Sequence, residues 1–180
     1  MQITLTLNDK KLTADVAPDT LLIDFVRSHG CLSVKRGCET SNCGLCTVFL
    51  DDKPVLSCSV LAARADGHKV TTLEGLQDEA AEFGAFIADQ GAEQCGFCNP
   101  GFIMNALALF REKEYPTDEE IKEYLSGNLC RCTATRRSRR PSSRPPGSLT
   151  STRTERGRSS DGTASFRHCQ PRHAAPCVHG

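Results

Sequence analysis

The chain has 180 residues, enough for one large domain or two small ones. Its formal net charge of zero hides two opposed segments, since residues 1–132 carry 12 Lys and Arg against 20 Asp and Glu, and residues 133–180 carry ten Arg against two acidic residues. The 11 cysteines cannot form a closed disulfide framework, because their number is odd. No apolar run approaches the ~18 residues of a membrane span. The start MQITLTLNDKK reads as a strand rather than a signal peptide, so we expect a cytoplasmic protein whose cysteines bind metal or do redox work.

The first half of the chain predicts a small sheet with one helix. Apolar residues alternate over 3–7 and 12–16 around an Asn8-Asp9-Lys10 turn, which indicates a β-hairpin. The apolar residues of 21–26 fall on one helical face, which Gly30 closes. A Gly- and Cys-rich loop follows, and the remaining elements are a hairpin over 47–50 and 53–56 and a last strand over 69–73. This order predicts an α+β fold with a β-grasp arrangement.

The second half of the folded body is predicted to be helical. Apolar residues recur at helical spacing over 79–91 and over 100–111. Thr117 and Glu120 have the spacing of a capping box just after a proline, so a further helix is expected to run to about Tyr124.

Four cysteines of the first half follow the pattern C-x4-C-x2-C, with eleven further residues before the fourth cysteine. This spacing is typical of plant-type 2Fe–2S ferredoxins, in which a tight loop delivers three of the four thiolates. Gly37 and Gly44 are expected to let the loop take positive φ and approach the cluster closely. A zinc knuckle is the alternative, although zinc sites normally show two close pairs. The predicted ligands are Cys38, Cys43, Cys46 and Cys58.

A second group of four cysteines lies in the strings QCGFCNPGF and GNLCRC, as two close pairs: Cys95 with Cys98, and Cys130 with Cys132. Taken alone, this pattern fits zinc as well as an iron–sulfur cluster. Cys98 lies at the start of the helix predicted over 100–111, where the helix dipole favours a thiolate. Cys31 is interpreted as a small buried residue.

The composition changes sharply after Cys132. The segment 133–180 is rich in Arg, Ser, Thr, Pro and Gly and contains no Lys, so we expect it to be disordered. Cys169 and Cys177 lie there among three histidines, but their spacing matches no well-formed metal site. No aromatic residue interleaves the run Arg136–Arg140, and we expect no nucleic-acid partner.

The order GCETSNCGLCTV, LSC, QCGFCNPGF and GNLCRCT resembles the small iron–sulfur subunit of the molybdenum hydroxylases, over about residues 1–133. That family includes xanthine dehydrogenase, aldehyde oxidoreductase and aerobic-type carbon monoxide dehydrogenase. The resemblance implies a ferredoxin-like domain over 1–74 and a four-helix-bundle domain over 75–133, each holding one 2Fe–2S cluster on its own cysteine quartet. It also places Gln94 and Cys132 near the pterin.

The resemblance further implies a role as an electron-transfer subunit with no catalytic residue of its own, most similar to that of xanthine dehydrogenase. Electrons would pass from the molybdopterin of a large subunit through both clusters to the FAD of a medium subunit. Molybdopterin and FAD would belong to these partners only, and no membrane is involved. Two alternatives remain open, a free-standing 2Fe–2S ferredoxin and a zinc-stabilised interaction module with a basic tail.

The likeness to the family stops within a residue or two of Thr133. In the family, the CRCT motif continues into Gly-Tyr and a final helix, whereas this chain continues Ala134-Thr135-Arg136-Arg137. We therefore interpret 134–180 as the product of a shifted reading frame, and we expect the last helix of the bundle to be missing.

Overall fold

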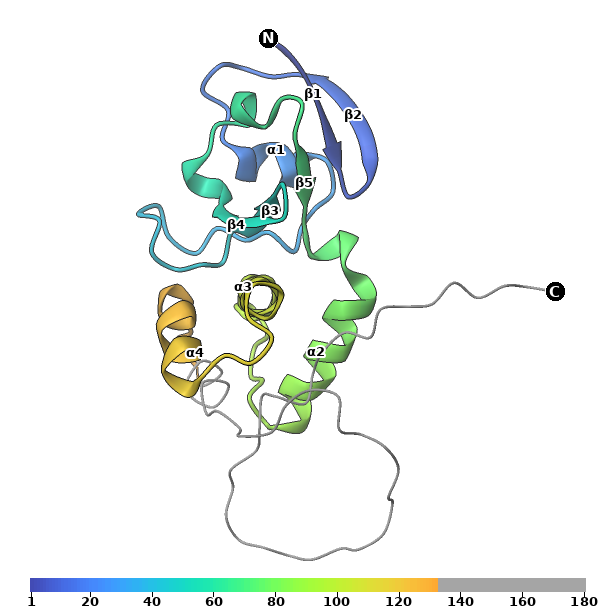
Figure 1. Ribbon diagram of the computed structural model, residues 1–180. Coiled ribbons are helices and arrows are strands. Elements are labelled where there is room, and N and C mark those ends of the chain that lie inside the picture. The colour runs from blue at the N-terminus through green and yellow to red at the C-terminus, as the bar shows by residue number, and fades with distance from the viewer. Residues whose placement is uncertain (133–180) are drawn as a thin grey trace, which may run out of the picture.

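The computed structural model describes residues 1–132 as a small sheet packed on a set of helices (Figure 1). The tail predicted over 134–180, with its expected disorder and its two cysteines, lies outside the described residues. Within residues 1–132 no helix is long and apolar enough to cross a membrane.

The N-terminal part is a five-stranded sheet in the order β2-β1-β5-β3-β4. The neighbours β1 and β5 are parallel and the other pairs are antiparallel. With the helix α1 inserted between the two hairpins, this is the predicted β-grasp arrangement. The elements are β1 (Gln2–Leu7), β2 (Lys10–Asp15), α1 (Leu22–Ser28), β3 (Thr47–Leu50), β4 (Lys53–Leu56) and β5 (Lys69–Thr71).

Both hairpins close through two-residue turns of the same kind. Asn8 and Asp9 have φ of 48° and 63°, and Asp51 and Asp52 have the same values. Two consecutive positive φ angles are the signature of a type I′ turn, which Asn and Asp tolerate and which matches the twist of the strands. The hairpins predicted from these short polar turns are therefore confirmed.

The last strand is shorter than predicted. β5 ends at Thr71, and the residues Leu73–Gly75 form a 3-10 turn, η3. The backbone N–H of Thr72 donates to the Asn8 side-chain oxygen at 2.8 Å instead of joining the ladder. This side-chain acceptor ends the pairing and turns the chain toward the helices.

The helix α1 packs its buried residues, Leu22, Ile23, Phe25 and Val26, against the sheet. The helix ends at Ser28, and Gly30, with φ of 90°, follows its C-cap His29 and closes it as predicted. The Val26 carbonyl accepts from the backbone N–H groups of His29 at 3.2 Å and Cys31 at 3.0 Å, so the last turn of the helix is paired.

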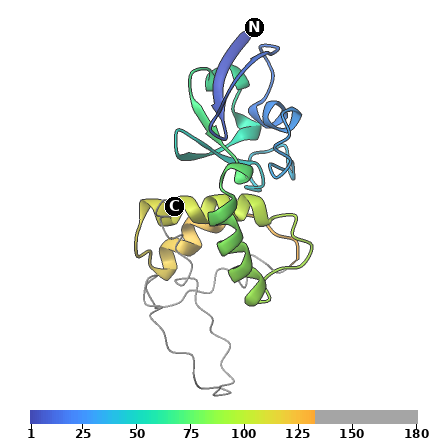
Figure 2. The same cartoon turned by 90° about the vertical axis from the view of Figure 1, so that its right-hand side faces the viewer.

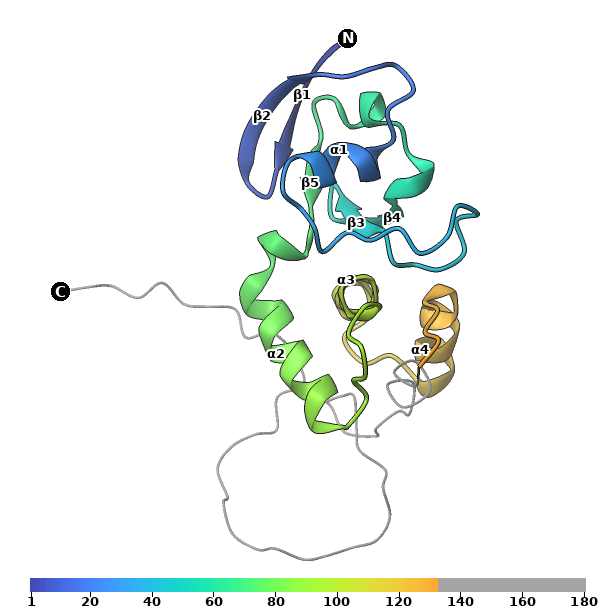
Figure 3. The same cartoon turned by 180° about the vertical axis from the view of Figure 1, so that it is seen from behind.

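The C-terminal part contains three α-helices within the described residues, and all were predicted. α3 lies directly under the sheet, and α2 and α4 flank it (Figures 1 and 3). The view turned by 90° shows α3 running across the base of the sheet domain (Figure 2). The helices are α2 (Gln77–Asp89), α3 (Asn99–Glu112) and α4 (Asp118–Tyr124), followed by the 3-10 turn η4 (Leu125–Gly127).

The capping box predicted for α4 is present in full. The Thr117 hydroxyl accepts from the Glu120 backbone N–H at 3.3 Å, and the Glu120 carboxylate accepts from the Thr117 backbone N–H at 2.7 Å. Two N–H groups that the helix itself cannot pair are thereby satisfied.

Strand β3 contributes to two hydrophobic cores. Val48 belongs to the core between the sheet and α1, whereas Phe49 belongs to the core of the helical part. Successive residues of a strand point to opposite faces of the sheet, so one strand can serve both cores. On the helical side, the Arg111 guanidinium lies 4.8 Å from the centroid of the Phe49 ring.

Candidate metal centres

The first cysteine quartet gathers beside the start of β3 and the end of β4. Cys38, Cys43 and Cys46 lie on the loop between α1 and β3, and Cys58 lies in the 3-10 turn Ser57–Ser59 that follows β4. The thiol of Cys38 contacts that of Cys43, and the thiol of Cys46 contacts that of Cys58. Cys43 and Cys46 are buried, whereas Cys38 and Cys58 are half-buried. The quartet therefore consists of two contacting pairs, each with an inner and an outer thiol.

Backbone N–H groups of the loop point at the sulfurs. Those of Thr40 and Asn42, the latter 3.4 Å from the Cys38 sulfur, lower the pKa of Cys38 to about 6. Burial raises the pKa of Cys46 to about 11 and also raises that of Cys43. The loop thus favours negative charge on its outer side and shields its inner side from water.

The two loop glycines act differently from one another. Gly44 has φ of 70°, as predicted. Gly37 is not among the residues with positive φ, so that prediction was wrong. A Cβ at Gly37 would lie 2.7 Å from Leu45 Cδ2 and 3.3 Å from the Cys43 sulfur. At this position a side chain would crowd Leu45 and, less closely, the Cys43 sulfur, whereas the backbone conformation does not require glycine.

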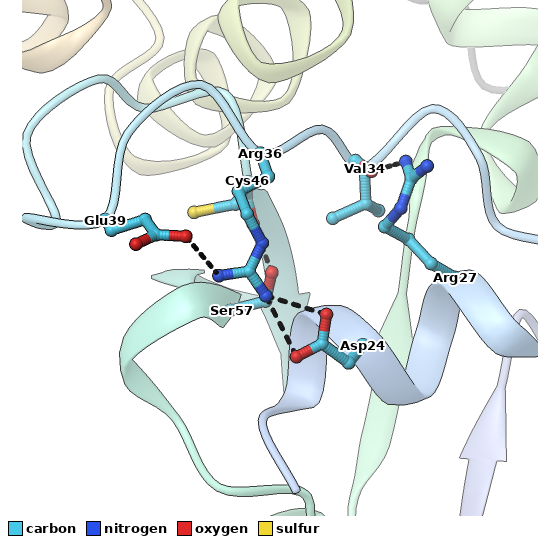
Figure 4. Close-up of polar contacts among 7 residues, drawn as sticks. All are labelled: Asp24, Arg27, Val34, Arg36, Glu39, Cys46 and Ser57. Atoms are coloured by element: carbon cyan, nitrogen blue, oxygen red, sulfur yellow. Dashed lines mark hydrogen bonds and ion pairs between the residues drawn. The ribbon is translucent and has the colours of Figure 1, made fainter.

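Side chains from α1 and from the turn after β4 hold the loop in place (Figure 4). The Arg36 guanidinium donates to both carboxylate oxygens of Asp24, at 2.7 and 2.9 Å, and lies 3.8 Å from the Glu39 carboxylate. The Ser57 hydroxyl donates to the Cys46 carbonyl at 2.7 Å. The Arg36 cation interacts electrostatically with Cys58, which places a positive charge beside this quartet.

The second quartet joins the loop before α3 to the segment after η4. Cys98 is the N-cap residue of α3, as predicted, and Cys95 precedes it in the loop. The sulfurs of Cys95 and Cys132 lie 3.7 Å apart, and Cys98 contacts Cys130. Cys95 and Cys132 are exposed, whereas Cys98 and Cys130 are half-buried. This quartet also consists of two pairs, one at the surface and one further from it.

The position of Cys98 at the helix start does not lower its pKa. Burial, together with the neighbouring Cys130, raises the pKa of Cys98 to about 12. The N–H of Phe97 instead lowers the pKa of Cys95, on the exposed side of the quartet. Gln94 is exposed beside Cys95.

The nine cysteines of residues 1–132 are all free of disulfides. Cys31, as expected, is buried, and its sulfur accepts from the Asn8 side-chain amide at 3.5 Å. In the same part of the chain, no three His, Cys, Asp and Glu side chains are gathered closely enough to hold a single metal ion. The eight thiols of the two quartets instead form four contacting pairs, two in each quartet.

The two quartets approach each other at one junction. The Leu129 backbone N–H donates to the Cys43 carbonyl at 3.0 Å. A Cβ at Gly101 would lie only 2.3 Å from the Gly44 carbonyl oxygen, so the helical part packs directly on the loop backbone. Asn128, which the sequence analysis did not single out, is buried at this point. Its only sequence signal is its place in the string GNLCRC.

Comparison with known proteins accounts for both quartets. Residues 5–82 match the 2Fe-2S iron-sulfur cluster binding domain, and residues 72–141 match the [2Fe-2S] binding domain. The xanthine dehydrogenase iron-sulfur-binding subunit of Escherichia coli O157:H7 is 42% identical over 132 residues, which are 71% of this chain and 83% of that protein. This chain belongs to the small 2Fe–2S subunits of the molybdenum hydroxylases.

Other members of the family agree in sequence and in fold. The nicotinate dehydrogenase small FeS subunit of Eubacterium barkeri is 42% identical over 73% of this chain and 85% of that protein. The structure of quinoline 2-oxidoreductase from Pseudomonas putida 86 superposes with a TM-score of 0.71 at 36% identity, over 76% of this chain and 86% of that one. The chain therefore contains two 2Fe–2S binding domains, which neither a zinc-stabilised module nor a free-standing 2Fe–2S ferredoxin accounts for.

Proposed function

We propose that this small subunit carries electrons between a molybdopterin-containing large subunit and an FAD-containing medium subunit. One 2Fe–2S cluster would be held by Cys38, Cys43, Cys46 and Cys58, and the other by Cys95, Cys98, Cys130 and Cys132. A 2Fe–2S cluster on four thiolates takes up and releases electrons, and its potential depends on hydrogen bonds to the sulfurs and on exposure. The chain itself supplies the thiolates and their surroundings, and the reaction with substrate belongs to the large subunit.

The pairing of the thiols is the observation that carries this proposal. A structural zinc ion draws four ligands toward one point, at about 2.3 Å for each sulfur. A two-iron cluster instead divides its four thiolates between two irons. The contacts of Cys38 with Cys43 and of Cys46 with Cys58 match the second case, and so do the two contacting pairs of the helical domain.

The exposure of each quartet supports an order for the electron path. In the helical domain, the exposed thiols of Cys95 and Cys132, with Gln94 beside them, form the outward face. This face would meet the molybdopterin of the large subunit. Cys98 and Cys130 are more buried, and the residue before Cys130 bonds to the loop of the first quartet. The outer thiols of the first quartet, Cys38 and Cys58, would then face the FAD subunit.

The two cluster domains are proposed to divide at residues 74 and 75. η3 ends at Gly75 and α2 begins at Gln77, so this division falls at the turn that leads from the sheet to the helices. The proposed ferredoxin domain is then 1–74, and the proposed helical cluster domain is 75–133.

The test is EPR spectroscopy of the full chain after anaerobic reduction with dithionite, with iron counted on the same sample. Two distinct 2Fe–2S signals and about four irons per chain are expected. One signal with half the iron would overturn the assignment of the second quartet. A chain without an iron signal would overturn the proposal as a whole.

A further inference from the structure

A backbone hydrogen bond links the two proposed cluster sites. The N–H of Leu129 donates to the carbonyl of Cys43 at 3.0 Å. Cys43 is a proposed ligand of the first cluster, and the residue bonded to Leu129 is Cys130, a proposed ligand of the second. A ligand of one site is therefore joined to a ligand of the other through one hydrogen bond and a short stretch of main chain.

The side chain of Asn128 fixes the segment that makes this contact. It is 3% exposed, and its Nδ2 donates to the Gly101 carbonyl at 3.3 Å. Its Oδ1 accepts from Asn105 Nδ2 at 2.6 Å. Gly101 and Asn105 both belong to α3, the helix whose N-cap is Cys98. Asn128 therefore attaches the segment before Cys130 to the helix that begins at another ligand of the same site.

Asn128 also lies against the loop of the first quartet. A Cβ at Gly44 would be 2.6 Å from Asn128 Nδ2 and 2.9 Å from the Gly127 carbonyl oxygen. The bare backbone next to Cys43 thus gives Asn128 the room it occupies. One buried amide packs on the loop of one cluster site and hydrogen-bonds to the helix of the other.

An asparagine is suited to this place by its hydrogen-bonding groups. An amide can donate to one partner and accept from another, whereas a carboxylate only accepts. An aspartate here would place its charge against the Gly101 carbonyl. An alanine would leave both the Gly101 carbonyl and the Asn105 amide without this partner, which is costly in a buried position.

We propose that Asn128 is a positioning residue for electron exchange between the two clusters. It acts by holding the Asn128–Leu129 peptide, whose N–H belongs to Leu129, against the Cys43 carbonyl. This inference rests on the proposed function, because it requires clusters on both quartets. The effect of Asn128 is expected on the contact between the sites rather than on either site alone.

The experiment compares the full chain with its Asn128→Ala and Asn128→Asp variants, each reduced until both clusters carry an electron. Iron content and the two separate EPR signals report whether the clusters assemble. The mutual broadening of the two signals reports their interaction. Both variants are expected to keep about four irons and both signals, and to lose most of the broadening.

The matched control is Asn8→Ala. Asn8 also makes several side-chain hydrogen bonds, to Thr72 and Cys31, but at the turn between β1 and β2. The Asn8→Ala variant is expected to lower the stability of the chain and to leave the mutual broadening of the two EPR signals unchanged. If it removes the broadening as well, general loosening explains the effect and the inference is overturned.

The remaining outcomes separate this inference from the proposed function. If the unaltered chain lacks two clusters, the proposed function fails together with the inference. If the unaltered chain has two signals, the function stands, and three outcomes would overturn the inference alone. The first is that the two signals do not broaden each other, and the second is that both Asn128 variants keep the broadening. The third is that both variants lose the second cluster. In the last case Asn128 would serve cluster assembly instead.

Discussion

The carboxylate of Glu74 binds Ser33 across 41 residues of sequence. Its Oε2 accepts from the Ser33 hydroxyl at 2.5 Å, and its Oε1 accepts from the Ser33 backbone N–H at 2.8 Å. The Thr72 hydroxyl donates to the same Oε2 at 2.6 Å. Glu74 thereby ties the start of the first cysteine loop to the turn that leads into the helical domain.

This carboxylate is expected to make stability depend on pH. Burial acts to raise the pKa of Glu74, but the hydrogen bonds from Ser33 and Thr72 outweigh it and hold the pKa below its usual value. The stabilisation by the Glu74 carboxylate is therefore complete above its unfolded-state pKa of about 4.3. It is lost as the pH falls through the lower pKa of the folded state. Melting temperatures measured from pH 7 downward should fall less steeply in Glu74→Gln than in the unaltered chain.

Glu74→Gln should also cost about 2 kcal/mol at neutral pH, since charged hydrogen bonds are replaced. Glu82→Gln, on the exposed side of α2, is the control. It should change neither the stability at neutral pH nor the dependence of the melting temperature on pH. A pH profile that is the same in Glu74→Gln and in the unaltered chain would contradict the prediction.

Two glycine substitutions should have opposite effects on stability. Gly101→Ala places a Cβ 2.3 Å from the Gly44 carbonyl oxygen and 2.8 Å from Leu45 Cα, and backbone atoms cannot move aside cheaply. We expect a loss of roughly 1–3 kcal/mol. Gly84→Ala meets nothing within 4 Å inside α2, so it should gain up to about 1 kcal/mol from helix propensity. Thermal unfolding of both variants checks the pair, and a neutral Gly101→Ala would contradict the close packing.

The capping box of α4 should be sensitive to sequence and to acid. Thr117→Ala should cost ~1 kcal/mol, because the Glu120 N–H loses its acceptor. Lys113 and the Thr117 N–H lower the pKa of Glu120 to about 2. The contribution of this carboxylate is thus present above its unfolded-state pKa and lost as the pH falls toward about 2. Protection factors of the α4 amides, which correct for the pH dependence of intrinsic exchange, should fall over that range, and Glu120→Gln should remove most of this fall.

Single Cys→Ser variants should separate the two clusters. Cys38→Ser should alter or remove one 2Fe–2S signal, and Cys132→Ser the other, because each removes one thiolate from a different quartet. Cys31→Ser is the matched control, since Cys31 is buried beside Asn8 and belongs to neither quartet. Loss of the same signal in Cys38→Ser and Cys132→Ser would show that the eight thiols are divided otherwise.

The Arg36 cation should raise the potential of the first cluster. Because Arg36 interacts electrostatically with Cys58, it favours the more negative, reduced state. Arg36→Gln should therefore make that potential more negative and leave the other cluster unchanged in a potentiometric EPR titration. Lys10→Gln removes the same charge from the exposed start of β2 and should shift neither potential.

Local signals explain the parts of the fold that the sequence predicted. The Asn8-Asp9 and Asp51-Asp52 turns and the Thr117–Glu120 capping box each depend on residues that are neighbours in the chain. The apolar periodicity over 100–111 placed Cys98 at the start of α3 for the same reason.

Contacts between distant residues explain what the sequence did not predict. β5 stops early because Thr72 pairs with a side chain 64 residues away. Which thiol contacts which depends on how η1 (Ser57–Ser59) and the segment after η4 return to the loops, and spacing alone leaves this open. Asn128 escaped notice because a single buried asparagine has no periodicity, and its importance lies in three-dimensional neighbours such as Gly44 and Gly101.

The division of β3 between two cores has a consequence for how the subunit unfolds. Phe49 is fully covered in the full chain, by residues of the helical core and by Arg111. A fragment ending at residue 74 would lack the helical core and turn this aromatic ring to solvent. Heat or denaturant should accordingly melt residues 1–132 in one cooperative transition, with neither half surviving the other as an independent folding unit.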